Sequence, residues 1–127
     1  MVQKLAWVFA VVFLAVGILG FVPGITSEGH LLGIFAVDTI HNVIHLLAGV
    51  LALLVAWKWT ASAGLYFKAF GLVYLLVAVI GFLMGGESIL GIFAANMADH
   101  VLHVVLAVAM VYIGFFMKSE DAAAPMA

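Results

Sequence analysis

Four long apolar runs divide the chain, and short stretches with polar residues or glycine separate them. The runs cover Leu5–Val22, Leu31–Trp57, Leu65–Met84 and Ile89–Met117. Apolar runs of about 18 or more residues are typical of membrane-spanning helices. The pattern therefore predicts an all-α, polytopic membrane protein in which four transmembrane helices form a single bundle over residues 1–118. The remaining residues, 119–127, are polar or small and are expected to form a disordered cytoplasmic tail.

The second and fourth runs begin with similar sequences, which indicates an internal repeat. LLGIFAVDTIHNVIH at residues 31–45 aligns with ILGIFAANMADHVLH at residues 89–103, at a constant offset of 58 residues. The repeating unit is a helical hairpin, with repeat 1 at about residues 5–57 and repeat 2 at about residues 65–117. Parallel repeats are related by an axis along the membrane normal, so the second and fourth helices are expected to face each other.

Two polar residues predict where the second and fourth helices begin. Asp38 and Asn96 are equivalent in the repeat, and both residue types are favoured as helix N-caps because the side-chain oxygen accepts a backbone N–H. The helices would then cover Thr39–Trp57 and Met97–Met117, about 28 and 31 Å long, which fits a bilayer core of about 30 Å. Asn96 and Asp99 together resemble a capping box. The preceding segments LLGIFAV and ILGIFAA are expected to be apolar connectors in the membrane interface.

Charge is scarce, and its placement predicts an orientation. In a four-span topology all lysines fall on one side, which the positive-inside rule makes cytoplasmic: Lys4, Lys58, Lys68 and Lys118. We therefore expect a multi-pass protein of the cell (plasma or inner) membrane with both termini in the cytoplasm and the first helix retained. The net charge of −2 and the lack of a basic run exclude nucleic acid as a partner. The lipid bilayer is the expected partner, and a homo-oligomer or larger membrane complex stays open.

Polar side chains gather in both copies of the repeat, although only 8% of the chain is charged. The polar residues of the two copies are Asp38, His41, Asn42 and His45, and Asn96, Asp99, His100 and His103. A helix turns by about 100° per residue, so each set lies on one helical face. Ionisable groups inside a membrane usually face the bundle interior and pair with one another. The two sets are therefore expected to converge between the second and fourth helices, in the extracytoplasmic half.

A divalent transition metal is one candidate occupant of this cluster. Neutral imidazole and carboxylate suit such metals, and the chain has no cysteine to supply a thiolate. His41 and His45 are four residues apart on one helical face, which is a common chelating arrangement. The candidate metal ligands are His41, His45, Asp99, His100 and His103, while helix caps and a polar network are expected of Asp38, Asn42 and Asn96.

Three other interpretations stay open. In the first, the cluster is only a hydrogen-bond lock between two helices of a structural or accessory subunit, each bond contributing about 0.6–2 kcal/mol. In the second, His45 and His103 are the axial ligands of a b-type haem, although the chain has no arginine to hold the propionates. The third is a solute or proton pathway. The sequence contains no nucleophile–base pair or cofactor fingerprint, so we do not expect an enzyme.

The polar motifs also carry a family resemblance. VDTIHNVIHLLAG and ANMADHVLHVVLA, which open the second and fourth helices, resemble the small four-helix membrane proteins of domain-of-unknown-function family 4383. The resemblance covers most of the chain, from the first helix to the end of the fourth. It implies the duplicated four-helix membrane fold and no particular activity. His100 stands where the family usually has asparagine, and this departure adds a candidate ligand.

Overall fold

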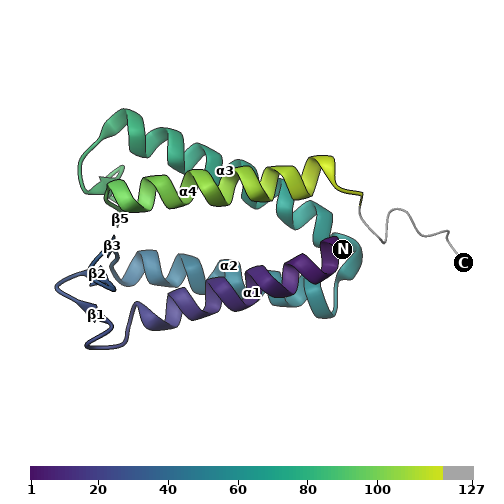
Figure 1. Cartoon of the computed structure of the whole chain (residues 1–127), viewed down its shortest axis with the longest axis horizontal. Coiled ribbons are helices and arrows are strands. Elements are labelled where there is room, and N and C mark those ends of the chain that lie inside the picture. The colour runs from purple at the N-terminus through teal and green to yellow at the C-terminus, as the bar shows by residue number, and fades with distance from the viewer. Residues whose placement is uncertain (119–127) are drawn as a thin grey trace, which may run out of the picture.

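Four long helices account for most of the chain (Figure 1). They are α1 (Val2–Leu19), α2 (Thr39–Trp57), α3 (Ala63–Met84) and α4 (Met97–Val111) in this computed structural model, which describes residues 1–118. All four are long and apolar enough to cross a membrane, with the short turns η1 (Thr60–Ser62) and η2 (Tyr112–Phe116) counted with α3 and α4. The prediction of a mostly helical chain with four spans is confirmed. The expected tail, residues 119–127, lies outside the described residues.

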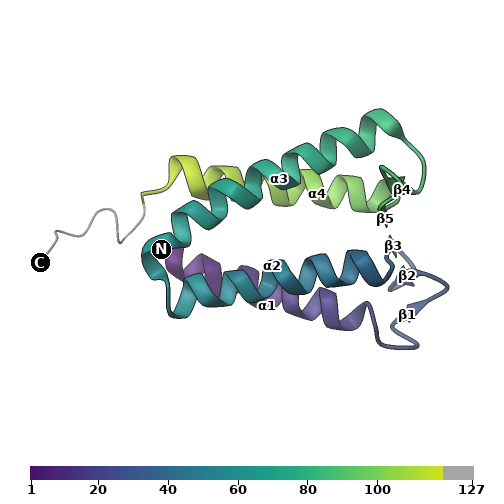
Figure 2. The same cartoon turned by 180° about the vertical axis from the view of Figure 1, so that it is seen from behind.

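The helices pair into two hairpins, α1 with α2 and α3 with α4 (Figures 1 and 2). Glycine allows the helices of a pair to approach closely. A Cβ added at Gly17 would lie 2.7 Å from the side chain of Leu46, and one at Gly71 would lie 2.8 Å from the backbone nitrogen of Val111. Small residues let helix backbones pack against each other in this way. Each hairpin is therefore packed more closely within itself than against the other.

The two ends of the bundle differ in structure. The N-terminus, the link between α2 and α3 and the end of η2 lie at one end, and the strands lie at the other (Figures 1 and 2). We call these the terminal end and the strand end. Because α2 and α4 both begin at the strand end, their polar N-terminal motifs lie there together.

The segments expected to be plain apolar connectors form short antiparallel strands instead. The strands before α2 are β1 (Thr26–Ser27), β2 (His30–Leu31) and β3 (Phe35–Ala36), and those before α4 are β4 (Ser88–Ile89) and β5 (Phe93–Ala94). The β2–β3 and β4–β5 pairs have matching registers, with Leu31 opposite Phe35 and Ile89 opposite Phe93. We refer to residues 20–38 and 85–96 as the strand connectors.

Both strand connectors use the same tight turn. Leu32 and Gly33 have φ angles of 55° and 71°, and Leu90 and Gly91 have φ angles of 52° and 69°. Two consecutive residues with positive φ are the mark of a type I′ turn, whose twist matches that of the flanking strands. Asparagine and glycine are the usual residues in such a turn. Leucine at the first position explains why the sequence pattern did not reveal it.

The helix starts follow the predicted caps. α2 covers Thr39–Trp57 as predicted, and α4 begins at Met97 as predicted, although its last turn is a π-helix that ends at Phe116. The first helix differs from its prediction: it runs from Val2 to Leu19 rather than from Leu5 to Val22. Its earlier end has a local cause, because Val22 precedes Pro23 and a residue before proline is disfavoured in the α conformation.

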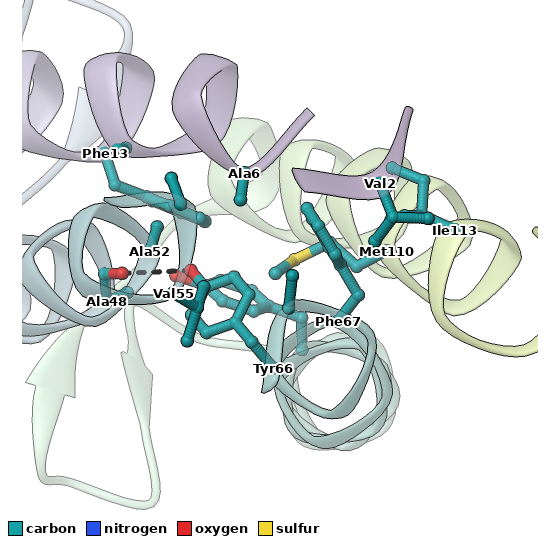
Figure 3. Packing of buried hydrophobic residues seen from close by; sticks show 14 of the residues in the cluster. Val2, Ala6, Phe13, Ala48, Ala52, Val55, Tyr66, Phe67, Met110 and Ile113 are labelled. Carbon is teal, nitrogen blue, oxygen red and sulfur yellow. Dashed lines mark hydrogen bonds between the residues drawn. The ribbon is translucent and has the colours of Figure 1, made fainter. Parts of the chain in front are cut away.

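An apolar core joins all four helices (Figure 3). Phe13 of α1, Phe67 of α3 and Met110 of α4 are almost fully buried in it. One hydrogen bond crosses between the hairpins here: the hydroxyl of Tyr66 donates to the carbonyl of Ala48 at 2.9 Å (Figure 3). The apolar core fixes the two hairpins relative to each other below the polar residues of the strand end.

Candidate metal site

Asp38 links the two hairpins at the strand end. As the N-cap of α2, it accepts the backbone N–H of His41 on Oδ1 at 2.8 Å. Its second oxygen, Oδ2, accepts the backbone N–H of Ala94 at 2.8 Å. Ala94 belongs to the strand connector of the other hairpin, so one carboxylate both caps a helix and ties the two halves together. Hydrogen bonds to a carboxylate are among the stronger ones in proteins.

Asn96 is the N-cap of α4, as Asp38 is of α2. Its Oδ1 accepts the backbone N–H of Asp99 at 3.1 Å, and Asp99 Oδ2 accepts the backbone N–H of Asn96 at 2.9 Å. The predicted capping box is therefore present. The Asn96 amide also donates to the carbonyl of Ile34 at 2.9 Å, which is a second bond between the hairpins.

The hydrogen bonds of His41 determine which of its ring nitrogens is free. Nδ1 lies 2.7 Å from the carbonyl oxygen of Ala94 and 3.1 Å from that of Ala36. Carbonyl oxygens only accept hydrogen bonds, so Nδ1 must carry the proton and donate. In the neutral ring the lone pair then lies on Nε2. Backbone carbonyls orient metal-ligating histidines in this same way.

Three histidines from both hairpins converge beneath this layer. His41 and His45 come from α2, and His103 comes from α4. The ring centroid of His41 lies 4.6 Å from that of His45 and 5.8 Å from that of His103. Each residue offers one nitrogen, and these three atoms all lie within 4.8 Å of one another. We call His41, His45 and His103 the histidine triad.

Each histidine of the triad has one ring nitrogen without a hydrogen-bond partner among the described residues. His41 Nε2, His45 Nδ1 and His103 Nδ1 are buried, and none makes a hydrogen bond within the described part of the chain. A buried polar atom left unsatisfied costs about 1–3 kcal/mol. Such atoms are uncommon in folded proteins and each calls for a physical explanation. His100 Nδ1 and Nε2, Asn42 Oδ1 and the Tyr74 hydroxyl are unpaired in the same way, but only the triad brings three histidines together where one bound ion could accept several lone pairs.

Two aromatic rings form the floor of the triad. Phe13 and Tyr74 stack at 5.6 Å, with Phe13 lying 6.0 Å from the ring of His45 and Tyr74 lying 5.5 Å from the ring of His103. These two residues were not among the sequence candidates, because isolated aromatics in apolar helices are usually core residues. They separate the polar cluster from the apolar core.

Asn42 and His100 pack within their own hairpins. The side chain of Asn42 packs on Gly20, the residue after α1, where an added Cβ would lie 1.9 Å from its Oδ1. His100 packs on Gly81 of α3 in the same way, at 2.4 Å from its Nδ1. The expected cluster of five ligands is thus resolved into the triad, with His100 turned towards α3 and Asp99 engaged in the capping box. Gly20 and Gly81, which lie before the polar motifs of the two repeats, were the sequence signal that could have separated Asn42 and His100 from the triad.

The three histidines of the triad are almost fully buried. His41, His45 and His103 are 1%, 4% and 2% exposed. The strand connectors cover this end with further buried residues, namely Leu31, Ala36, Val37, Ile89 and Ala95. Asp99 lines the same cavity as His45, which places a carboxyl group beside the triad. The site therefore combines three buried histidine rings with a neighbouring carboxyl group.

Comparison with known proteins assigns the chain to a family. Neither a curated protein nor a solved structure matches it. The family model described as "Domain of unknown function (DUF4383)" matches residues 3–116, which is most of the chain and includes all four helices and both polar motifs. The resemblance noted in the polar motifs is thereby confirmed. This small four-span membrane protein, with its buried histidine triad, belongs to the DUF4383 family.

Proposed function

We propose that the protein is a non-enzymatic membrane protein that binds a divalent transition metal ion at the histidine triad. The observation that carries this proposal is the convergence of three buried histidines from both hairpins, each of which offers one ring nitrogen within 4.8 Å of the others. Each of these rings also has one buried nitrogen without a hydrogen bond within the described residues. A metal ion would accept one lone pair from each ring.

The geometry of the triad is close to that of a bound metal. In a tetrahedral site with metal–nitrogen bonds of about 2.0–2.1 Å, the nitrogens lie about 3.3 Å apart. The triad nitrogens lie within 4.8 Å of one another, so small side-chain rotations would bring them into range. Neutral imidazoles suit zinc, copper, nickel and ferrous iron. Three protein ligands leave a further coordination position open, as in catalytic zinc sites.

Asp99 offers a way to offset the charge of the ion. A doubly charged ion held by neutral ligands is costly inside a membrane unless an opposite charge lies nearby. Asp99 is buried, lies one turn before His103 in α4 and lines a cavity together with His45. We therefore assign it the role of a neighbouring counter-charge rather than of a direct ligand.

A hydrogen-bond lock explains only part of the cluster. Asp38, Asn96 and His41 Nδ1 do tie the hairpins together through backbone groups. The lock leaves the inward-facing nitrogens of the triad unexplained, and these favour metal binding. A structural lock that only joins the hairpins is thus the second candidate function.

The space beside the triad argues against haem. The cavity that touches both His45 and His103 has a volume of about 220 Å³. Pockets for ligands of drug size measure about 300–1,000 Å³, and a porphyrin needs such a volume. His41 also lies against both rings, in the space that the macrocycle would need. A metal ion alone fits the site better.

Two further proposals concern the whole chain. The matching turns, caps and glycine contacts of the two hairpins support an origin by duplication, with the hairpins related by an axis along the membrane normal. The lysines lie near the terminal end, which supports a cytoplasmic location for both termini. The triad would then lie in the extracytoplasmic half of the membrane.

Elemental analysis of the purified, detergent-solubilised protein tests metal binding. We expect about one metal ion per chain in the wild type, as a single-site model requires. The His45→Ala/His103→Ala variant should lose this metal because it loses two of the three ligands. The His100→Ala variant is the matched control, since His100 is an equally buried histidine of α4 outside the triad. Metal retained by the double variant, or absent from the wild type, would contradict the proposal.

A further inference from the structure

Three cavities touch the triad, and two of them are apolar grooves on the sides of the bundle. The first lies between α2 and α3 and has a volume of about 220 Å³. Ile44 and Val73 on its lining are exposed, whereas His45, Tyr74 and His103 are buried. The groove thus runs from the outer face of two membrane-spanning helices inwards to two ligands of the triad.

The second groove lies on the opposite side, between α1 and α4. It has a volume of about 190 Å³ and is lined by Val12, Phe13, Val16, Leu102 and His45, among others. Val12 is 44% exposed and marks its outer edge, while His45 is buried. His45 therefore lies at the inner end of both grooves.

The walls of these grooves select for uncharged molecules. Apart from the triad, the residues named above are aliphatic or aromatic. Moving a charge into such surroundings is costly, whereas a small apolar molecule dissolves in the bilayer and meets no such barrier. The third cavity, of about 110 Å³, lies beside the first strand connector and is lined by Leu32, His45 and Asp99, so a cation has a route along a carboxyl group. An uncharged molecule has the two apolar side grooves, which open between membrane-spanning helices.

We propose that the metal-loaded triad binds a small uncharged diatomic gas, such as nitric oxide, that reaches it through the bilayer. This inference rests on the proposed metal site. The gas would take the coordination position that three histidines leave open. The step is an addition to an ion with a partly filled d shell, such as ferrous iron or cobalt(II), and zinc with its full d shell would not support it. One metal–nitrogen bond forms, no bond within the gas breaks, any water on the metal leaves, and no external reductant is required. The volumes of the grooves admit a diatomic molecule and lie below those of larger ligand pockets.

Cobalt-loaded protein in lipid nanodiscs allows a direct test. Metal content is measured first, and then the visible absorption and EPR spectra are recorded with nitric oxide and, separately, with azide. Nitric oxide should change both spectra, and azide should not, because azide is an anion: the two side grooves are apolar and the third cavity carries the carboxyl group of Asp99. If the spectra of the cobalt-loaded protein do not change with nitric oxide, or change equally with azide, the inference is wrong and the metal site still stands. Failure to load any metal would overturn both.

Variants that fill the grooves test the route itself. Val77→Phe narrows the first groove and Val16→Phe narrows the second. Together they should slow nitric oxide binding about tenfold with unchanged metal content. The control is Val79→Phe, which adds the same bulk to an exposed position of α3 outside both grooves. An unchanged rate in the double variant would show that the gas takes another path, contrary to the inference.

Discussion

The role of each polar side chain in this bundle depends on the residue that it packs against. His100 and His103 are one helical turn apart, yet His103 faces the other hairpin and His100 faces Gly81. Sequence spacing predicted that both would point inwards, and it could not separate them because a few tens of degrees of helix rotation decide the outcome. The prediction of the triad members His41, His45 and His103 as ligands remains a prediction until a metal is measured.

The contact between Gly81 and His100 predicts a steric conflict. A Gly81→Ala substitution places a Cβ 2.4 Å from His100 Nδ1, and His100 is buried and cannot move aside freely. Overpacking of this kind costs about 1–3 kcal/mol, which exceeds the gain of up to about 1 kcal/mol from replacing a helical glycine by alanine. We expect a lower Tm in detergent. In a His100→Ala background the same substitution should be neutral or stabilising, and a lower Tm there too would contradict the assigned contact.

At the scale of elements, local signals predicted some boundaries and missed others. Asp38 and Asn96 marked the starts of α2 and α4 correctly, because capping depends on residues within one turn. The β hairpins before them were missed. Their strands are two residues long, which is too short for an alternating pattern, and their turns use leucine where asparagine is usual.

The leucine in each type I′ turn predicts a stabilising substitution. Leu32 and Leu90 hold positive φ angles, which cost an ordinary residue about 1 kcal/mol or more, and their side chains are exposed. Leu32→Asn/Leu90→Asn should therefore raise the Tm in detergent, because asparagine tolerates this conformation. The comparison is Ile34→Asn/Ile92→Asn, which changes neighbouring exposed positions without positive φ. Equal effects of the two pairs would argue against backbone strain as the cause.

Over the whole molecule, the triad draws its ligands from both hairpins. His41 and His45 belong to the first and His103 to the second, while the closest helix packing lies within each hairpin. A bound metal would therefore add a bond across the weaker of the two kinds of interface. The four spans and their pairing followed from hydrophobicity and chain order, whereas this crossing contact depended on tertiary packing that the sequence pattern does not encode.

Metal should consequently raise the stability of the whole bundle. A ligand that binds only the folded state adds about 2.7 kcal/mol at a free concentration of about 100 times its Kd. We expect Zn²⁺ to raise the Tm of the wild type and of His100→Ala, and to leave that of His103→Ala nearly unchanged, because this variant has no ligand left on the second hairpin. The measurement is thermal denaturation in detergent with and without the ion. A similar increase in all three proteins would indicate binding elsewhere.

The position of the covalent link gives the chain one more property. The hairpins are joined by the short segment between α2 and α3 at the terminal end (Figure 1). The triad lies in the first turns of α2 and α4, which begin at the strand end. Metal coordination by the triad would therefore join the two hairpins a second time, at the end of the bundle opposite their covalent link. The effective concentration at which His103 meets His41 and His45 is set by that distant link and by the apolar core. Whatever alters the packing at the terminal end, including contact with another membrane protein, would thus tune the metal affinity of a site that it never touches.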